Sequence, residues 1–387
     1  MPHPHAVQHP QAAGHPHALE ALDVGATLVG TSWPGYVFAA APRNVYWETT
    51  IACELACQHC RADAIRQRDP LELTTEEARA LMRDVRAMGS MLILTGGDPM
   101  QRPDIMDLIA YGREIGLPVS ITPSTTRSLT REHVAEFRAL GVAAMGVSLD
   151  GPTAAVHDAF RGVDGTFARS QQALAWAREF RIPVQINTTV TSTTRPHLPD
   201  LFRLLKDEAS PPVRRWSLFL LVPVGRGERL GIPDAAEVED LFAWVYATGL
   251  DAPFHVSTVE APHYRRYWIQ RRLAEGSTVP EIQRLAKRMG FGVRDGNGVI
   301  FVSHRGEVYP AGFLPHPLLG SVREQPLSAI YRTSPALTAL RDADGFTGRC
   351  GRCEFRWACG GSRARAYAMT GDVLGTDPFC GYEPAAS

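Results

Sequence analysis

Short β-rich runs alternate with helical stretches between residues 44 and 222 of this 387-residue chain, and no other feature constrains its fold as strongly. Helix starts are recognisable between the runs, as in LTTEEARALMRDVRAMG, where a threonine precedes two glutamates. Six β/α units in series predict a parallel α/β fold, either open or partly closed as a barrel. The expected strands are 44–50, 91–95, 118–122, 144–149, 184–190 and 215–222.

The unusual residues of the chain come directly after these expected strands. Three cysteines follow the first strand, GGDP follows the second and PSTT the third, while the fourth runs into SLDG and the sixth ends in VPVGRG. On the fifth strand Asn187 and Thr189 alternate, so that both side chains point to one face. Because parallel α/β folds place their chemistry in the loops after the C-terminal strand ends, we expect a single active rim.

Composition limits the possible partners. The chain carries 40 Lys and Arg against 41 Asp and Glu, so it lacks the global basic field that binds nucleic acids or anionic membranes. The first residues, rich in histidine and proline, read as a disordered tail and not as a signal peptide, and the apolar run LFLLVPV is too short to span a bilayer. We therefore expect a cytoplasmic protein whose clustered cysteines serve metal or redox chemistry.

Three of the seven cysteines lie close together, because Cys53, Cys57 and Cys60 have the spacing C-x3-C-x2-C. A loop this tight can direct three thiolates at one iron–sulfur cubane and leave one iron without a protein ligand. Zinc normally takes four protein ligands, and His59, next to Cys60, is poorly placed as the fourth. A ferredoxin-like carrier needs a fourth nearby cysteine. Three inert core cysteines fit badly with the polar neighbours, so the cubane is favoured.

The other four cysteines, Cys350, Cys353, Cys359 and Cys380, have the spacing C-x2-C-x5-C-x20-C. They complete either a tetrahedral zinc site or a [4Fe–4S] cluster, and spacing alone leaves the metal open. Upstream of them, GVIFVSHRGEVYP predicts two strands around a turn at His304, a place where a histidine is more often at the surface than a ligand.

In combination, the three-cysteine loop after the first strand, GGDP after the second and VSLDG after the fourth resemble the radical S-adenosylmethionine (SAM) superfamily. The four-cysteine tail resembles the SPASM or twitch extensions of that superfamily, which house auxiliary [4Fe–4S] clusters. CELACQHCRA, GEVYPAGFLP and the four-cysteine segment look most like the heme-biosynthetic branch. Two departures stand out: Asp98 replaces the glutamate of many members, and Ala311 stands where many two-cluster SPASM proteins carry a cysteine, so a second auxiliary cluster is not expected.

The resemblance covers roughly residues 41–384 and implies a partial (βα)6 TIM-type barrel with a small C-terminal iron–sulfur domain built from a β-hairpin plus helix. The implied domains are a tail and lead-in at 1–40, the radical SAM core barrel at 41–235, a helical connecting region at 236–297 and a SPASM/twitch-like auxiliary cluster domain at 298–387.

The implied activity is that of an oxidoreductase or lyase-type enzyme that reductively cleaves SAM to a 5′-deoxyadenosyl radical, which abstracts hydrogen from a substrate. We expect a carboxylated tetrapyrrole, modified by oxidative decarboxylation or side-chain removal, with an external electron donor such as a flavodoxin or ferredoxin. One alternative is a maturase of a ribosomal peptide or another small metabolite. A second, of a different class, is a non-catalytic iron–sulfur electron-transfer or zinc-binding protein.

The resemblance also implies roles for individual residues. Cys53, Cys57 and Cys60 would hold the SAM cluster and the other four cysteines the auxiliary cluster, and no catalytic side chain is assigned beyond the clusters. Each candidate for SAM also has a structural reading as a turn, cap or core residue. The candidates for SAM are Gly96, Gly97, Asp98, Pro99, Ser148, Asp150, Arg161, Asn187, Thr189, Val222 and Val224.

A separate run, EAPHYRRYW, supplies candidates for the carboxylates of the substrate, because forked arginines suit such groups. These candidates are His263, Tyr264, Arg265 and Arg266. The alternative for this run is a solvated helix face anchored by its aromatic residues.

Overall fold

The computed structural model describes residues 33–207 and 213–384 of the chain. One 10-stranded sheet runs in the order β10-β9-β8-β1-β2-β3-β4-β5-β6-β7. Neighbouring strands from β8 through β1 to β7 are parallel, and only β9 and β10 run antiparallel to their neighbours. The strands are β1 Asn44–Glu48, β2 Met91–Thr95, β3 Val119–Ile121, β4 Met145–Ser148, β5 Val184–Val190, β6 Val213–Leu220, β7 His255–Val259, β8 Val299–Val302, β9 Glu307–Tyr309 and β10 Gly320–Ser321.

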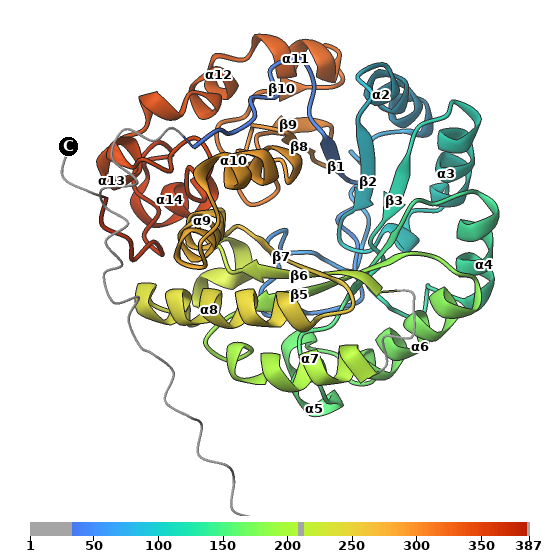
Figure 1. Ribbon diagram of the computed structural model, residues 1–387. Coiled ribbons are helices and arrows are strands. Elements are labelled where there is room, and N and C mark those ends of the chain that lie inside the picture. The colour runs from blue at the N-terminus through green and yellow to red at the C-terminus, as the bar shows by residue number, and fades with distance from the viewer. Residues whose placement is uncertain (1–32, 208–212, 385–387) are drawn as a thin grey trace, which may run out of the picture.

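Helices surround the curled sheet on its outer side (Figure 1). Helix α2 shows why they form where they do, because Thr74 and Glu77 build a capping box and the buried face of the helix packs into the main core. The helices are α2 Thr75–Ala87, α3 Ile105–Glu114, α4 Arg131–Ala139, α5 Ala154–Arg161, α6 Thr166–Glu179, α7 Leu198–Asp207, α8 Ala235–Asp251, α9 Tyr264–Ala274, α10 Val279–Arg288, α11 Leu327–Thr333, α12 Pro335–Arg341, α13 Gly348–Arg352 and α14 Arg363–Thr370.

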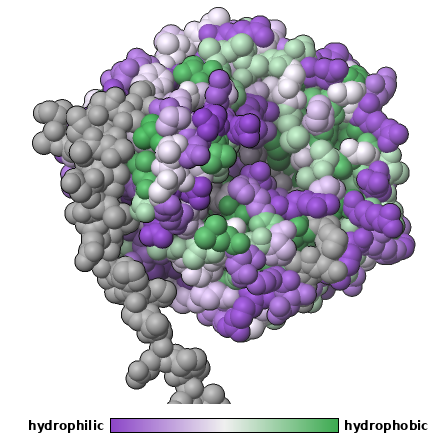
Figure 2. All heavy atoms as spheres, viewed as in Figure 1, coloured by the Kyte–Doolittle hydropathy of each residue, from purple (hydrophilic) through white to green (hydrophobic). Residues whose placement is uncertain are grey.

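Strand alternation separates the two faces of the sheet. In β5, Val184, Ile186 and Val190 are buried toward the helices, whereas Asn187 and Thr189 lie half-buried on the inner face. Figure 2, in the same view as Figure 1, shows the surface hollowed near its centre. The expected parallel α/β barrel is confirmed, and its inner face carries polar side chains.

Two strands of the parallel sheet were not expected as part of the barrel. Strand β7 lies within residues 236–297, which were expected to form a helical connecting region, and it pairs in parallel with β6. The pattern of β7 was missed because HVSTV is short and only one of its residues is buried. The predicted hairpin around His304 is confirmed as β8 and β9, but β8 also pairs with β1 and thereby extends the barrel sheet.

The segment between β7 and β8 forms α9 and α10, which Figure 1 places between these two strands. A second, smaller core joins these helices to the cysteine-rich end of the chain, since Ile269, Ile282 and Ala286 pack with Phe355 and Cys359. Within the described ranges, no helix has the length and apolar character needed to cross a membrane.

Candidate active site

The three-cysteine loop follows β1 and gathers its sulfur atoms in a small core of its own. Cys53, Leu55 and Cys57 are buried together, and the half-buried Cys60 packs against them. All three cysteines are free thiols. N–H groups point at the sulfurs, with the backbone N–H of Leu55 3.4 Å from Cys53 Sγ and that of Ala64 3.5 Å from Cys60 Sγ. Such donors favour a negatively charged sulfur, as an iron ligand requires.

Burial acts in the opposite direction on the free thiols. It raises the pKa of Cys53 to about 11 and also raises the pKa of Cys57, although Arg161 beside Cys57 opposes the shift. These thiols therefore stay protonated at neutral pH until a metal displaces their protons.

The glycines after β2 lie directly against the cysteine loop. The Gly97 N–H donates to Thr50 O at 2.8 Å, and a Cβ at Gly97 would stand 2.4 Å from Ala52 O. At Gly96, whose φ is +148°, a Cβ would stand 2.5 Å from Thr50 O. Only glycine fits at these two positions, because the backbone of the cysteine loop lies directly against them.

Asp98 is buried, and its carboxylate is fully engaged by the protein. It accepts hydrogen bonds from the backbone N–H groups of Met100 and Ser124 and, at 2.7 Å, from the Thr126 hydroxyl. Asp98 therefore joins the loop after β2 to the loop after β3. Pro99, also buried, begins the short helix η1 Pro99–Gln101 that continues this turn.

Asp150 and Arg161 form a buried ion pair next to the cysteines. The Asp150 carboxylate accepts from Arg161 Nε at 2.7 Å and from the Thr189 N–H at 2.7 Å, and Arg161 Nη1 lies 3.7 Å from Cys57 Sγ. Burial raises the pKa of Asp150, but the Arg161 guanidinium outweighs it and holds that pKa below its usual value. The ends of β4, α5 and β5 thus meet at one cysteine.

The remaining SAM candidates lie at the same end of the barrel. Ser148, the last residue of β4, and Asn187, the middle residue of β5, are half-buried and lie opposite each other in register. Val222 is buried and Val224 half-buried after β6. The sequence did not single out Arg226, two residues on, which donates to Cys57 O and Ala64 O and fixes the backbone of the cysteine loop; its only signal is its place in VPVGRG.

The second cysteine set surrounds a cavity outside the barrel. Cys350, Cys353, Cys359 and Cys380 line it together with His263. Burial raises the pKa of Cys353 to about 12 and that of Cys359 well above its usual value. Donors approach these sulfurs too, with the Gly361 N–H 3.3 Å from Cys359 Sγ and Arg363 Nη2 3.5 Å from Cys350 Sγ.

Comparison with known proteins identifies the family. The family model "Radical SAM superfamily" matches residues 47–205. An "AdoMet-dependent heme synthase" of Nitratidesulfovibrio vulgaris is 40% identical over 343 residues, which cover 88% of this chain and 92% of the relative. This chain belongs to the radical SAM superfamily. A "Pre-heme d1 synthase" of Dinoroseobacter shibae is 31% identical over 355 residues, covering 87% of this chain and 85% of that protein.

The fold agrees with this membership. The crystal structure of Streptococcus suis SuiB bound to S-adenosylmethionine superimposes with a TM-score of 0.67 at 16% identity, covering 89% of this chain and 78% of SuiB. Membership of the superfamily makes the protein an enzyme that uses SAM and a [4Fe–4S] cluster. The three free thiols that meet in one loop, with N–H donors on their sulfurs, fit such a cluster.

The candidate substrate residues of this radical SAM enzyme do not lie on a solvated helix face, so that alternative is wrong. His263 is fully buried beside the four-cysteine cavity, and burial lowers its pKa to about 3. Among the residues that the structure describes, neither of its ring nitrogens has a hydrogen-bond partner. Arg266 is paired with Glu239 and Gln270. Arg265 donates to backbone oxygens, and Tyr264 packs on an aromatic ring. The segment is therefore a wall of the four-cysteine site.

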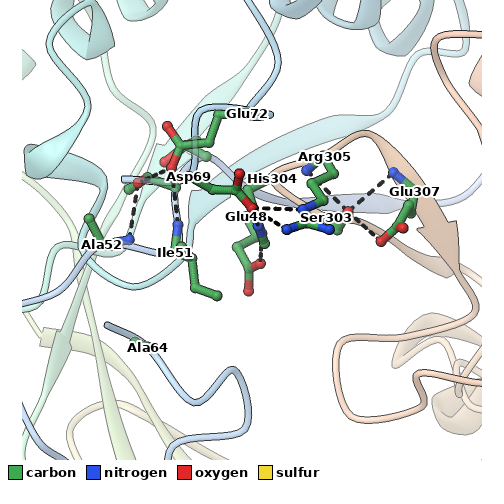
Figure 3. Close-up of polar contacts among 12 residues, drawn as sticks. Glu48, Ile51, Ala52, Ala64, Asp69, Glu72, Ser303, His304, Arg305 and Glu307 are labelled. Carbon is green, nitrogen blue, oxygen red and sulfur yellow. Dashed lines mark hydrogen bonds and ion pairs between the residues drawn. The ribbon is translucent and has the colours of Figure 1, made fainter. Parts of the chain in front are cut away.

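His304 is the other residue whose expected surface position is wrong. Only 9% of it is exposed, and its two ring nitrogens lie 2.6 Å from Glu48 Oε1 and 3.2 Å from Asp69 Oδ2. Figure 3 shows His304 between these two carboxylates, with Arg305 beside Asp69. Arg61 donates to the other oxygen of Glu48 at 2.9 Å. The hairpin is thereby tied to both ends of the cysteine loop.

Proposed function

We propose that this radical SAM enzyme removes the carboxyl groups of tetrapyrrole side chains by oxidative decarboxylation in the biosynthesis of a heme-type cofactor. The observation that carries the proposal is the 40% identity to an AdoMet-dependent heme synthase, because the match covers 88% of this chain and 92% of that relative. The pre-heme d1 synthase at 31% identity supports the same class of substrate.

In this proposal Cys53, Cys57 and Cys60 hold a [4Fe–4S] cluster whose fourth iron is left for SAM. When bound, cluster and SAM together supply a reductively formed 5′-deoxyadenosyl radical. The protein shapes and shields the site. Arg161 and Arg226 hold the cysteine loop from two sides through the contacts described above.

Residues at the strand ends complete the proposed SAM site. Gly96 to Pro99 form the turn against the cysteine loop, and the half-buried Ser148, Asn187 and Thr189 offer polar groups on the inner face. The half-buried Val224 offers apolar surface that suits an adenine ring, and the buried Val222 is the second apolar candidate at this strand end. Asp150 and Arg161 act in this proposal by positioning Cys57, since they are committed to each other.

In the proposed conversion, the 5′-deoxyadenosyl radical takes one hydrogen atom from the propionate CH2 that is bonded to the tetrapyrrole ring and becomes 5′-deoxyadenosine. The bond between the second CH2 and the carboxylate then breaks, carbon dioxide and one electron leave, and a vinyl group remains. We propose that the four-cysteine site holds one auxiliary [4Fe–4S] cluster and that its full set of cysteines suits it to electron transfer. An external carrier such as a flavodoxin or ferredoxin would supply the electron that starts each turnover.

We retain residues 298–387 as the proposed auxiliary cluster domain, residues 236–297 as its connection and residues 41–235 as the core. The pairing of β8 with β1 shows that the sheet continues across this proposed boundary. The smaller core around Cys359 supports a packing unit that joins α9 and α10 to the cysteine-rich end.

Anaerobically reconstituted enzyme tests the proposal. Given SAM, a strong reductant and iron-coproporphyrin III, it should release 5′-deoxyadenosine and carbon dioxide and convert propionates into vinyl groups, followed by mass spectrometry. Sirohaem derivatives and candidate peptides serve as the comparison substrates. If the enzyme converts a peptide and binds none of the porphyrins, the proposed tetrapyrrole substrate is wrong and the peptide is the substrate. If intact protein never releases 5′-deoxyadenosine, the proposed radical chemistry is wrong.

A further inference from the structure

We propose that Arg61 binds a carboxylate of the substrate on the inner wall of the barrel, next to an aromatic wall made by Phe219, Phe301 and Phe313. The ligand is a flat aromatic ring system that carries at least one carboxylate. The inference rests on the proposed function for the identity of that ligand, but the site itself is built from contacts of the described residues.

Arg61 lies on the inner face of the barrel beside the SAM cluster loop. It follows Cys60 directly, and its guanidinium carbon is 4.4 Å from the centroid of the Phe301 ring. Phe301 is in register with Tyr46 of β1, whereas the next residue of β1, Trp47, is buried on the opposite face among the helices. Arg61 therefore covers the inner, aromatic side of β8.

Arg61 keeps hydrogen-bond donors free. Its Nη2 donates to Glu48, but in the part of the chain that the structure describes neither Nε nor Nη1 has a partner, and 21% of the side chain is exposed. Two arginines that contact the cysteine loop are engaged: Arg161 is paired with Asp150, and Arg226 donates to the backbone of the loop. A planar guanidinium with a free edge matches the two oxygens of a carboxylate.

The Glu48–His304–Asp69 contacts hold Arg61 in place. Both ring nitrogens of His304 face carboxylate oxygens, which only accept hydrogen bonds, so the ring donates from both nitrogens and is positively charged (Figure 3). Glu48 is thus shared by two cations and neutralises neither of them completely. Glu48 and His304 are positioning residues in this inference, because they orient Arg61 without touching the ligand.

The aromatic wall supplies the complementary surface. Phe313 follows Gly312, where a Cβ would stand 3.3 Å from Arg61 Nε, and its ring lies 6.4 Å from that of Phe219 on β6. Phe219 and Phe313 are half-buried, so part of each ring remains available. Aromatic rings favour offset or edge contacts with a flat macrocycle, and the arginine beside them selects a ring system with a carboxylate.

Binding of iron-coproporphyrin III to reconstituted holoenzyme, followed by its absorbance change, tests the inference. Loss of hydrogen bonds to a charged group predicts that Arg61→Gln weakens binding by about 10- to 100-fold, with Arg61→Lys falling between Gln and the unmodified enzyme. Arg131→Gln is the matched control, because it removes an exposed arginine that pairs with Glu179 on the outer helices α4 and α6, and it should leave binding unchanged.

Esterification of the substrate separates recognition from folding. The unmodified enzyme should bind the tetramethyl ester much more weakly than the acid, whereas Arg61→Gln should discriminate far less between the two. Iron content and substrate-free SAM cleavage verify that the cluster next to Arg61 is intact. Equal binding of the acid by Arg61→Gln and the unmodified enzyme overturns the inference. Failure of the unmodified enzyme itself to bind the acid overturns the proposed function instead.

Discussion

The two cysteine sites are surrounded by the same kinds of charged side chains, but one site has three cysteines and the other has four. In each, a buried arginine approaches a sulfur, Arg161 at Cys57 and Arg363 at Cys350. In each, a buried aspartate forms an ion pair with an arginine, Asp150 with Arg161 and Asp377 with Arg365. The same kind of support can therefore serve either an open or a closed iron–sulfur site.

What distinguishes the sites is the position in the fold. The three-cysteine loop sits at the end of a barrel strand, pressed against the glycines after β2, so groups from several strand ends can converge on one ligand. The four-cysteine site lies outside the sheet and is walled by α9 and by its own cysteine-rich segment. In the proposed clusters, three cysteines leave an iron for SAM whereas four leave none.

Removal of one cysteine from each site is expected to have the largest effect and to separate the two roles. Cys57→Ala should abolish release of 5′-deoxyadenosine, because the open cluster cannot form, whereas Cys353→Ala should retain it and lose the tetrapyrrole product. Each variant should fall from about eight to about four irons per chain. Anaerobic SAM cleavage and iron assays measure this. Wild-type SAM cleavage by Cys57→Ala would show that the assignment of the sites is wrong.

Replacement of the two buried aspartates compares the support of each site. Asp150→Asn and Asp377→Asn should each lower the free energy of unfolding by about 3–5 kcal/mol, because each leaves a buried arginine without its ion pair. Glu179→Gln, which breaks an exposed pair with Arg131, should leave the free energy of unfolding nearly unchanged, because water screens this pair. Urea denaturation measures all three. If the buried and exposed pairs lose similarly small amounts of unfolding free energy, the buried ion pairs do not support the cysteine sites as proposed.

Gly97→Ala tests the contact between the turn after β2 and the three-cysteine loop. Its methyl group would overlap the backbone of the cysteine loop, so we expect a loss of about 1–3 kcal/mol in stability and weaker SAM binding. Gly249 in α8 is the matched control, since a Cβ there meets nothing within 4 Å. Gly249→Ala should keep SAM binding and gain up to about 1 kcal/mol from helix propensity.

The smallest expected effect is the pH dependence of the contact between the hairpin and the cysteine loop. Burial lowers the pKa of His304, but the hydrogen bonds and charges of Glu48 and Asp69 outweigh it, so the pKa is raised. Its stabilisation is then fully present below about pH 6.5, the ordinary value, and is lost as the pH rises through the raised pKa.

Thermal unfolding of the unmodified protein and His304→Gln measures this contribution. The difference between their melting temperatures should be largest near pH 6 and should shrink on going to pH 9. Glu48 and Asp69, whose pKa values are lowered, remain charged over this range. A difference that grows with pH would show that the ring is neutral in the folded protein.

The parts of the fold that follow from local pattern were predicted well. Six strands and the hairpin around His304 were found because runs of β-rich residues and turn residues identify them individually. Strand β7 was missed because its edge position leaves most of HVSTV half-exposed, so it carries little of the apolar signal on which strand prediction depends.

The candidate site divides in the same way. The spacing of the cysteines and their position after a strand identified both sets, and the structure brings the SAM candidates to one end of the barrel. The pairing of Asp150 with Arg161, the burial of His304 and the role of Arg226 did not follow from the sequence, because each depends on a partner from another element.

By itself, then, the amino-acid sequence determined the α/β class, the family and the two sets of cysteines, since all of these depend on residues that are neighbours along the chain. Only the tertiary structure decided which charged groups are engaged and which are free. Glu48 and His304 are separated by 256 positions, yet their contact orients Arg61 and leaves its outer edge open. The physical reason is that an arginine becomes available to a ligand only when the folded chain has placed other acceptors out of its reach.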